Sequence, residues 1–127
     1  NAIPDKQFGK LQPELKHVEI TSLDKQLVDK ATQYVDDNIR DSSLNVESMA
    51  KAMGMSRVQL YKRLLPITGS TPTEFIRQIR LCRAEQLLRE SQLSVSEVAY
   101  SVGFNNPRYF SKYFKEMYGV MPSQYKK

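Results

Sequence analysis

The chain has 127 residues, of which 40% are hydrophobic and 26% are charged. This length suits one domain, or a domain with a tail, and no apolar run approaches the roughly 18 residues of a membrane-spanning helix. With one cysteine, Cys82, and one histidine, His17, the sequence offers neither an internal disulfide nor a His/Cys cluster with metal-ligand spacing. We expect no cofactor and no metal, a surface position for His17, and a packing role for Cys82.

The net charge of +5 is unevenly distributed. Residues 1–43 hold six Lys and Arg against eight Asp and Glu, a net charge of −2, whereas residues 44–127 hold thirteen against six, a net charge of +7. Basic side chains neutralise phosphates and release counterions, so the second region favours a polyanionic partner. Many basic domains bind no nucleic acid, so charge alone does not decide the function.

Residues 1–20 contain two prolines and a glycine and show no sustained hydrophobic period. We interpret this segment as a linker or arm, in which Asn1-Ala2 could be a cloning remnant, and we place the domain at residues 21–127. The start lacks the basic and apolar regions of a signal peptide. We therefore expect a cytoplasmic location and no membrane contact by this chain.

Three helices are predicted in the first half of the chain from hydrophobic periodicity and capping residues. The first runs from Leu23, with Thr21 or Ser22 as its cap, to Asp41-Ser42-Ser43. The second runs from its cap Asn45 to Gly54, and the third runs from its cap Ser56 to about Leu65, with Pro66 and Gly69 marking its end. The inward-facing positions of the three are Leu27, Val28, Ala31, Tyr34, Val35, Ile39, Val46, Met49, Ala50, Met53, Leu60, Leu64 and Leu65.

A long fourth helix is predicted at residues 72–90, because Thr71 and Glu74 form a capping box around a proline at the first helical position. Its core candidates are Phe75, Ile76, Ile79, Cys82, Leu87 and Leu88. Its arginines are placed on other faces of the helix: Arg77, Arg80, Arg83 and Arg89.

Two further helices and a short turn complete the chain. The fifth helix begins with the capping box of Ser94 and Glu97 and reaches Gly103, and the sixth begins at Asn106-Pro107 and stops at Gly119. Their inward positions are Val95, Val98, Ala99, Val102, Tyr109, Phe110, Tyr113, Phe114 and Met117, and a last turn covers Pro122 to Tyr125. No segment is typical of a strand, so the sequence predicts an all-α fold of about seven helices.

An internal repeat organises these helices. Leu44–Met55 is echoed by Leu93–Phe104 at an offset of 49, which becomes 50 after one inserted residue in the Asn105-Asn106 turn. Each copy predicts a short helix, a glycine turn and a second helix, which is a helix-turn-helix at about residues 45–66 and again at about 94–118. A duplicated helical hairpin without a nucleic-acid role is the alternative.

The second helix of a helix-turn-helix enters the major groove of DNA, and its early outward residues meet base edges. The outward candidates are Arg57, Val58, Tyr61 and Lys62 in the first copy and Asn106, Arg108, Ser111 and Lys112 in the second. Arg and Lys donate to guanine, Asn pairs with adenine, and Val and Tyr pack on the thymine methyl group. A solvated helix face also carries Arg and Lys, so each residue is a candidate and not an assignment.

The linker helix predicts a spacing for the two units. About 18 residues at 1.5 Å per residue span roughly 27 Å, and one turn of B-DNA is about 34 Å. A rigid connector of this length, with its turns, would set two reading helices into successive major grooves on one face of the duplex. The chain would then bind as a monomer, although the sequence does not give the orientation of the connector.

The second copy closely resembles the signature of the AraC/XylS family of bacterial transcription regulators. The resemblance rests on the run from Gly103 through Lys115 and on Gly119 through Tyr125, and it reaches back through Gly54-Met55-Ser56-Arg57 and Arg80–Ala84 to cover about residues 24–126. It implies seven helices with two helix-turn-helix units on a long linker helix. It also implies base contacts at Val58, Tyr61, Lys62, Arg108 and Lys112. The family often has more strongly hydrogen-bonding side chains where Val58 and Tyr61 stand, so the second unit is expected to hold more of the base specificity.

The lead-in Val18–Asp24 resembles that of hybrid two-component sensors of Bacteroides-type bacteria. Those proteins join a sensor, a histidine kinase, a receiver and a regulator domain in one chain. The resemblance implies that this chain is a C-terminal piece of a parent anchored in the inner membrane. Sugar or glycan sensing, and partnership with receiver and kinase domains, would then belong to the missing parts.

Double-stranded DNA binding for transcription control is therefore the leading hypothesis. The alternative is a protein-interaction module whose Tyr109, Tyr113 and Tyr118 surface docks RNA polymerase or a receiver domain. An enzyme is not expected, because the sequence shows no paired catalytic carboxylates, Cys/His pair, phosphate loop or metal set. The operator, the effector and the oligomeric state on DNA do not follow from the sequence.

Overall fold

The computed structural model describes residues 22–125, so the arm expected at residues 1–20 and the cap expected at Thr21 lie outside the described residues. The described part is all-α, with seven helices and no strand, which confirms the predicted fold class. The helices are α2 (Ser22–Asp37), α3 (Val46–Ala52), α4 (Arg57–Thr68), α5 (Pro72–Glu90), α6 (Val95–Ser101), α7 (Pro107–Tyr118) and α8 (Pro122–Tyr125).

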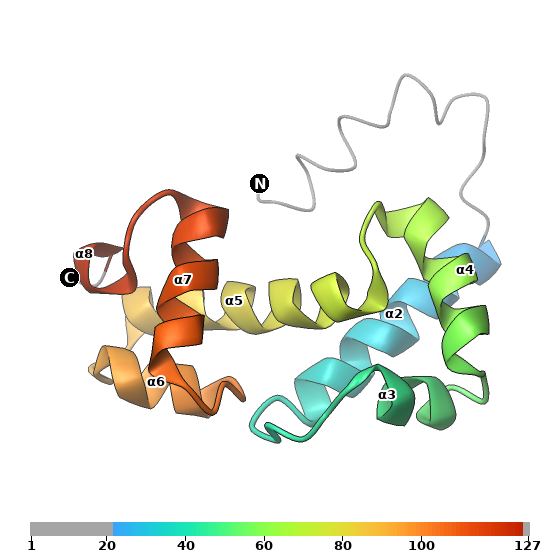
Figure 1. Cartoon of the computed structure of the whole chain (residues 1–127), viewed down its shortest axis with the longest axis horizontal. Coiled ribbons are helices and arrows are strands. Elements are labelled where there is room, and N and C mark those ends of the chain that lie inside the picture. Colours follow the sequence, from blue (N-terminus) through green and yellow to red (C-terminus); the bar gives the residue numbers. More distant parts are fainter. Residues whose placement is uncertain (1–21, 126–127) are drawn as a thin grey trace.

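The long helix α5 is the axis of the molecule (Figure 1). Helices α2, α3 and α4 gather around its first half, and α6, α7 and α8 gather around its second half. In the described residues, the principal helix contacts lie within one of these groups or join a group to α5. We call α2–α4 the first unit and α6–α8 the second unit.

Local capping fixes where most helices begin, as predicted. The Asn45, Ser56, Thr71 and Ser94 side chains each accept a hydrogen bond from the backbone N–H three residues later, and each of those later side chains accepts one from the cap's N–H. This reciprocal arrangement satisfies two donors that a helix start leaves open. Pro72 and Pro107 stand at first helical positions, where the missing N–H removes no bond.

Two predicted helix ends are wrong. Helix α2 ends at Asp37, not at Asp41-Ser42-Ser43, because the Asp41 carboxylate accepts bonds from the Ser43 N–H and hydroxyl and makes a separate turn. Helix α4 continues through Pro66 to Thr68. The last turn stays helical although Pro66 lacks a backbone N–H. Two hydrogen bonds stabilise this turn: the Thr68 hydroxyl donates to the Leu64 carbonyl at 2.9 Å, and the Gly69 N–H donates to the Leu65 carbonyl at 2.8 Å.

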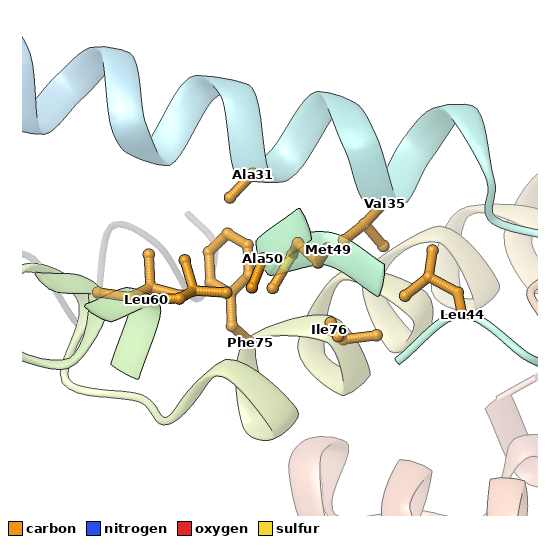
Figure 2. Close-up of a cluster of buried hydrophobic side chains, with 9 residues drawn as sticks. Ala31, Val35, Leu44, Met49, Ala50, Leu60, Phe75 and Ile76 are labelled. Carbon is orange, nitrogen blue, oxygen red and sulfur yellow. The ribbon is translucent and has the colours of Figure 1, made fainter. Parts of the chain in front are cut away.

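Each unit has its own buried core. Figure 2 shows the first core, where side chains of α2, α3, α4 and α5 converge. Its buried members are Ala31, Val35, Leu44, Met49, Ala50, Leu60, Leu64, Phe75 and Ile76. The second core comprises Leu81, Ala84, Leu88, Val98, Ala99, Val102, Phe110 and Phe114. Helix α5 thus supplies its first turns to one core and its later turns to the other.

Tyr109 was predicted to face the core, and the structure contradicts this, since 59% of its surface is exposed. Phe110 and Phe114, four residues apart, define the buried stripe of α7. Tyr109 lies about 100° around the helix from Phe110. It therefore points away from the second core and belongs to the outer surface of α7.

The prediction for Arg80 is also wrong, because this arginine lies inside the molecule with only 6% of its surface exposed. Its Nη1 donates to the Ile39 carbonyl at 3.2 Å and the Val102 carbonyl at 2.8 Å, and its Nη2 donates to the Asp41 carbonyl at 3.0 Å. Leu81 and Ala84, absent from the predicted core, are also buried. The reason is visible in the spacing: Ile76, Arg80, Ala84 and Leu88 form one i, i+4 row on the buried face of α5.

Gly103 leaves the space that Arg80 occupies. Its φ of +92° lies in the left-handed region, and a Cβ on it would meet Arg80 Nη1 at 1.3 Å and the Ile39 carbonyl oxygen at 2.4 Å. Both the backbone conformation and the close approach therefore require glycine.

Replacing Gly103 by alanine should lower the free energy of unfolding by at least about 3 kcal/mol, since strain is added to the loss of buried hydrogen bonds. Gly69 is the matched control, because its φ is +74° and a Cβ there meets nothing within 4 Å. Gly69→Ala should cost about 1–2 kcal/mol. Denaturant unfolding measures both values. Equal losses in the two variants would contradict the close approach at Gly103.

Candidate nucleic-acid interface

The two helix-turn-helix units, α3–α4 and α6–α7, have the same backbone hydrogen bonds at the offsets found in the sequence. The N–H after each turn glycine donates back across the turn: Met55 to the Ala50 carbonyl and Phe104 to the Ala99 carbonyl, both at 2.9 Å. Gly54 and Gly103 both have positive φ, as the turn requires. Gly69 and Gly119, 50 residues apart, end α4 and α7 in the same left-handed conformation. The repeat found in the sequence is therefore also a repeat of the backbone structure.

Helices α4 and α7 lie at opposite ends of α5 and run in broadly the same direction, with their first residues toward the lower side of Figure 1. Helix α5 has 19 residues and is therefore about 28 Å long. This length is comparable to the roughly 34 Å of one B-DNA turn.

The first-unit candidates come together on one side of α4. Arg57, Val58, Tyr61 and Lys62 are all exposed, Val58 to 60% and Tyr61 to 46%. They line a hollow of about 480 Å³ with Val46 of α3 and with Thr71, Pro72 and Thr73 at the start of α5. Two cations thus flank two exposed apolar side chains, which suits contact with phosphates at the edges and with a thymine methyl group between them.

The second-unit candidates are split between exposed and structural positions. Arg108 and Lys112 are exposed one turn apart on α7, whereas Asn106 and Ser111 are partly buried. The Asn106 side chain accepts a bond from the Arg108 N–H at 2.9 Å and caps α7. Its Oδ1 therefore already accepts one bond, and its second lone pair and its amide N–H groups remain for another partner.

Sequence reasoning missed two side chains of this surface. Tyr109 is exposed beside Arg108 in the first turn of α7. Arg77 of α5 lies with its guanidinium 4.1 Å from the centre of the Tyr113 ring, and the Lys112 ammonium lies 5.4 Å from the same ring. The sequence shows that Arg77 belongs to the arginine-rich helix α5, about one turn before Arg80. Only the contact with Tyr113 shows that the Arg77 side chain faces α7.

A second hollow, of about 410 Å³, lies between the two units. It is bounded by Asn45 and Arg57 of the first unit, by Arg77 and Arg80 of α5, and by Asn105 of the second turn. Glu47 is the acidic residue on its wall. Leu44, Val46, Ile76 and Phe104 also line it, so the wall combines a large apolar surface with the positive charge of three arginines.

The other arginines of α5 have internal partners. Arg83 makes a two-pronged ion pair with Asp36 of α2, at 2.8 and 2.6 Å, and Arg89 bonds to Glu85 at 2.7 Å. The Arg89 guanidinium holds the pKa of the Glu85 carboxyl below its usual value. Glu85 also accepts a bond from the Tyr125 hydroxyl and so ties α8 to α5.

Other chemistry has little support in the described residues. Residues 22–125 contain no group of three or more His, Cys, Asp and Glu side chains that could hold a metal ion. None of the described helices is both long and apolar enough to cross a membrane. Cys82 is partly buried, and burial raises the pKa of its thiol, as suits a packing role.

Comparisons with known proteins agree with this geometry. A family model described as a helix-turn-helix domain matches residues 49–127. The chain is 41% identical to Histidine kinase P4 of Formosa agariphila over 85% of its length, which is 8% of that protein. The C-terminal domain of AraT, a response regulator from Geobacillus stearothermophilus, has a TM-score of 0.73 and 30% identity, covering 85% of this chain and 86% of that one. The DNA-binding domain of AdpA, solved in complex with a target DNA, has a TM-score of 0.71 and 28% identity, covering 77% and 87%.

The chain spans only 8% to 38% of the length of the first curated relatives it matches. The similarity therefore concerns this domain, and the remaining parts of those proteins have no counterpart in it.

Proposed function

Since the chain belongs to the AraC-type helix-turn-helix family and acts in DNA-binding transcription regulation, we propose a specific mode of binding. A single chain contacts two successive major-groove segments of one double-stranded DNA. Helices α4 and α7 lie at the two ends of α5 and run in broadly the same direction, and this arrangement is the main support for the proposal (Figure 1). Two recognition helices joined by one rigid helix can contact the same face of the duplex, so no second chain is needed.

We assign the residues unequal roles. Arg108 and Lys112, exposed on α7, donate to base edges, most favourably to guanine. Arg57 and Lys62 bind phosphates beside the first groove, and Val58 and Tyr61 make apolar contacts in it. The second unit then holds more of the base specificity than the first.

Asn106 and Ser111 set the register of α7, because they are partly buried and Asn106 is occupied by its capping bond. Arg77 and Tyr109 join the interface as phosphate contacts from α5 and from the first turn of α7.

We further propose that this domain is the output of a larger signal-responsive protein of the hybrid two-component type. The similarity to a protein named as a histidine kinase and to a response-regulator domain supports this assignment. Kinase and receiver activities, and any membrane anchor, would belong to the rest of the parent. The domain itself would work in the cytoplasm and carry no catalytic activity.

A second candidate is docking to RNA polymerase or to a receiver domain. The exposure of Tyr109 to 59% and Tyr100 to 53% favours it, since aromatic side chains are enriched at protein interfaces. A pure docking module would bind no preferred DNA sequence, so the next experiment separates the two functions.

Selection from random duplex DNA should yield one motif with two half-sites. Affinity for that motif should fall with salt, with a slope of log affinity against log salt of about −4 or steeper, because several Lys and Arg displace counterions. Titrations at several salt concentrations measure the slope. Failure to select a motif, or an affinity independent of salt, would contradict DNA reading.

Arg108→Ala and Lys112→Ala should each cost about 1–3 kcal/mol of binding and relax the preference at particular base pairs. Val58→Ala, the matched substitution in the first unit, should cost less than about 1 kcal/mol, since it removes only an apolar contact. Binding to a panel of single-base variants of the selected DNA measures these effects. A uniform loss over the whole panel would make Arg108 and Lys112 phosphate contacts, and a larger effect at Val58 would reverse the proposed asymmetry.

A further inference from the structure

The relative orientation of the two units depends on very few direct ties. Each unit has its own core, and both cores include α5. Ile39 is the one side chain among the described residues that packs against both cores. Apolar packing is not directional, so contacts of this kind alone leave some freedom of rotation between the units.

Arg80 lies where the two cores meet, between Ile76 of the first and Leu81 of the second. Its guanidinium joins three backbone carbonyls from distant parts of the chain. Ile39 and Asp41 belong to the turn after α2, and Val102 is the C-cap residue that follows α6, directly before the turn glycine. One side chain thus bonds to the first unit and to the second unit at the same time.

The three carbonyls are suitable partners for a cation. Val102 stands at the C-terminal end of α6, where backbone carbonyls lack partners within the helix and the helix dipole is negative. The planar guanidinium offers several N–H donors in a fixed geometry, whereas a lysine ammonium is a single point charge. Arg80 therefore fixes both a distance and an angle between the turn that follows α2 and the C-terminal end of α6.

We propose that Arg80 is a positioning residue that locks the two helix-turn-helix units in one relative orientation and thereby sets the spacing of the two DNA half-sites. The effect on DNA rests on the proposed function, in which both units bind one duplex. Holding two binding modules in the bound geometry raises affinity without adding contacts, and it restricts which spacings are accepted.

The first test compares Arg80→Gln with Arg89→Gln. Both remove one positive charge from α5, but Arg89 bonds only within its own helix, to Glu85 and Glu90. The probes are the selected duplex, the same duplex with its half-sites moved by one or two base pairs, and a single half-site. Arg80→Gln should lose about tenfold affinity for the native spacing and show a flatter dependence on spacing, while its affinity for the single half-site stays within about twofold. A folded Arg80→Gln protein with the spacing profile of Arg89→Gln would overturn the proposal.

The second test needs no DNA. Spin labels at Lys51→Cys in α3 and Glu116→Cys in α7, both exposed positions, report the distance between the units in a Cys82→Ala background. The distance distribution should be narrow in the parent and in Arg89→Gln. It should broaden or shift in Arg80→Gln. A smaller change is expected in Arg80→Lys, which keeps the positive charge but loses the planar guanidinium with its several N–H donors.

The two tests separate the two ideas. An unchanged distribution in Arg80→Lys and Arg80→Gln would overturn the lock whether or not the protein binds DNA. A broadened distribution without any selected DNA motif would leave the lock in place and contradict the proposed function. If Arg80→Gln does not fold, Arg80→Lys still gives both the distance and the spacing profile.

Discussion

A buried guanidinium that donates to the carbonyls of Ile39, Asp41 and Val102 joins two helical units whose buried cores, within residues 22–125, are linked through α5 and the side chain of Ile39. Burial lowers the pKa of Arg80, and the negative charge of Asp41 opposes that effect. An arginine remains charged under these conditions, so the bonds are charge-assisted and directional. Gly103 completes the arrangement because any side chain there would occupy the place of the guanidinium. On our proposal, the spacing of the candidate DNA-contacting helices depends on this junction.

The same local design is used twice around this junction. Reciprocal caps start the short helices, a glycine with positive φ turns the chain, and a second glycine ends each longer helix. The outward side chains differ between the copies. Val58 and Tyr61 give the first copy an apolar surface, whereas Arg108 and Lys112 give the second copy hydrogen-bond donors. The two copies therefore share one backbone structure but have outer surfaces of different chemistry.

Most helix starts and turns, which neighbouring residues govern, were predictable from the sequence, whereas two helix ends and the contacts between distant residues were not. The caps at Asn45 and Ser94 and the turn at Gly103 are local, and all were predicted. The charge of Arg80 favours an exposed position, but the residue stands four residues from both Ile76 and Ala84 in a buried row of α5, so the predicted exposed position is wrong. Its carbonyl partners lie 22 to 41 positions away, where no local pattern could reveal them. The contact residues on DNA remain predictions for the same reason, because their partner is another molecule.

In the proposed function, a single chain places two reading helices in neighbouring major grooves of one duplex. Hydroxyl-radical footprinting of the selected DNA, combined with the stoichiometry of the complex, tests it most directly. We expect one chain per site and two protected segments about 10 base pairs apart on one face of the duplex. A single protected segment, or two segments that appear only when two chains are bound, would contradict it.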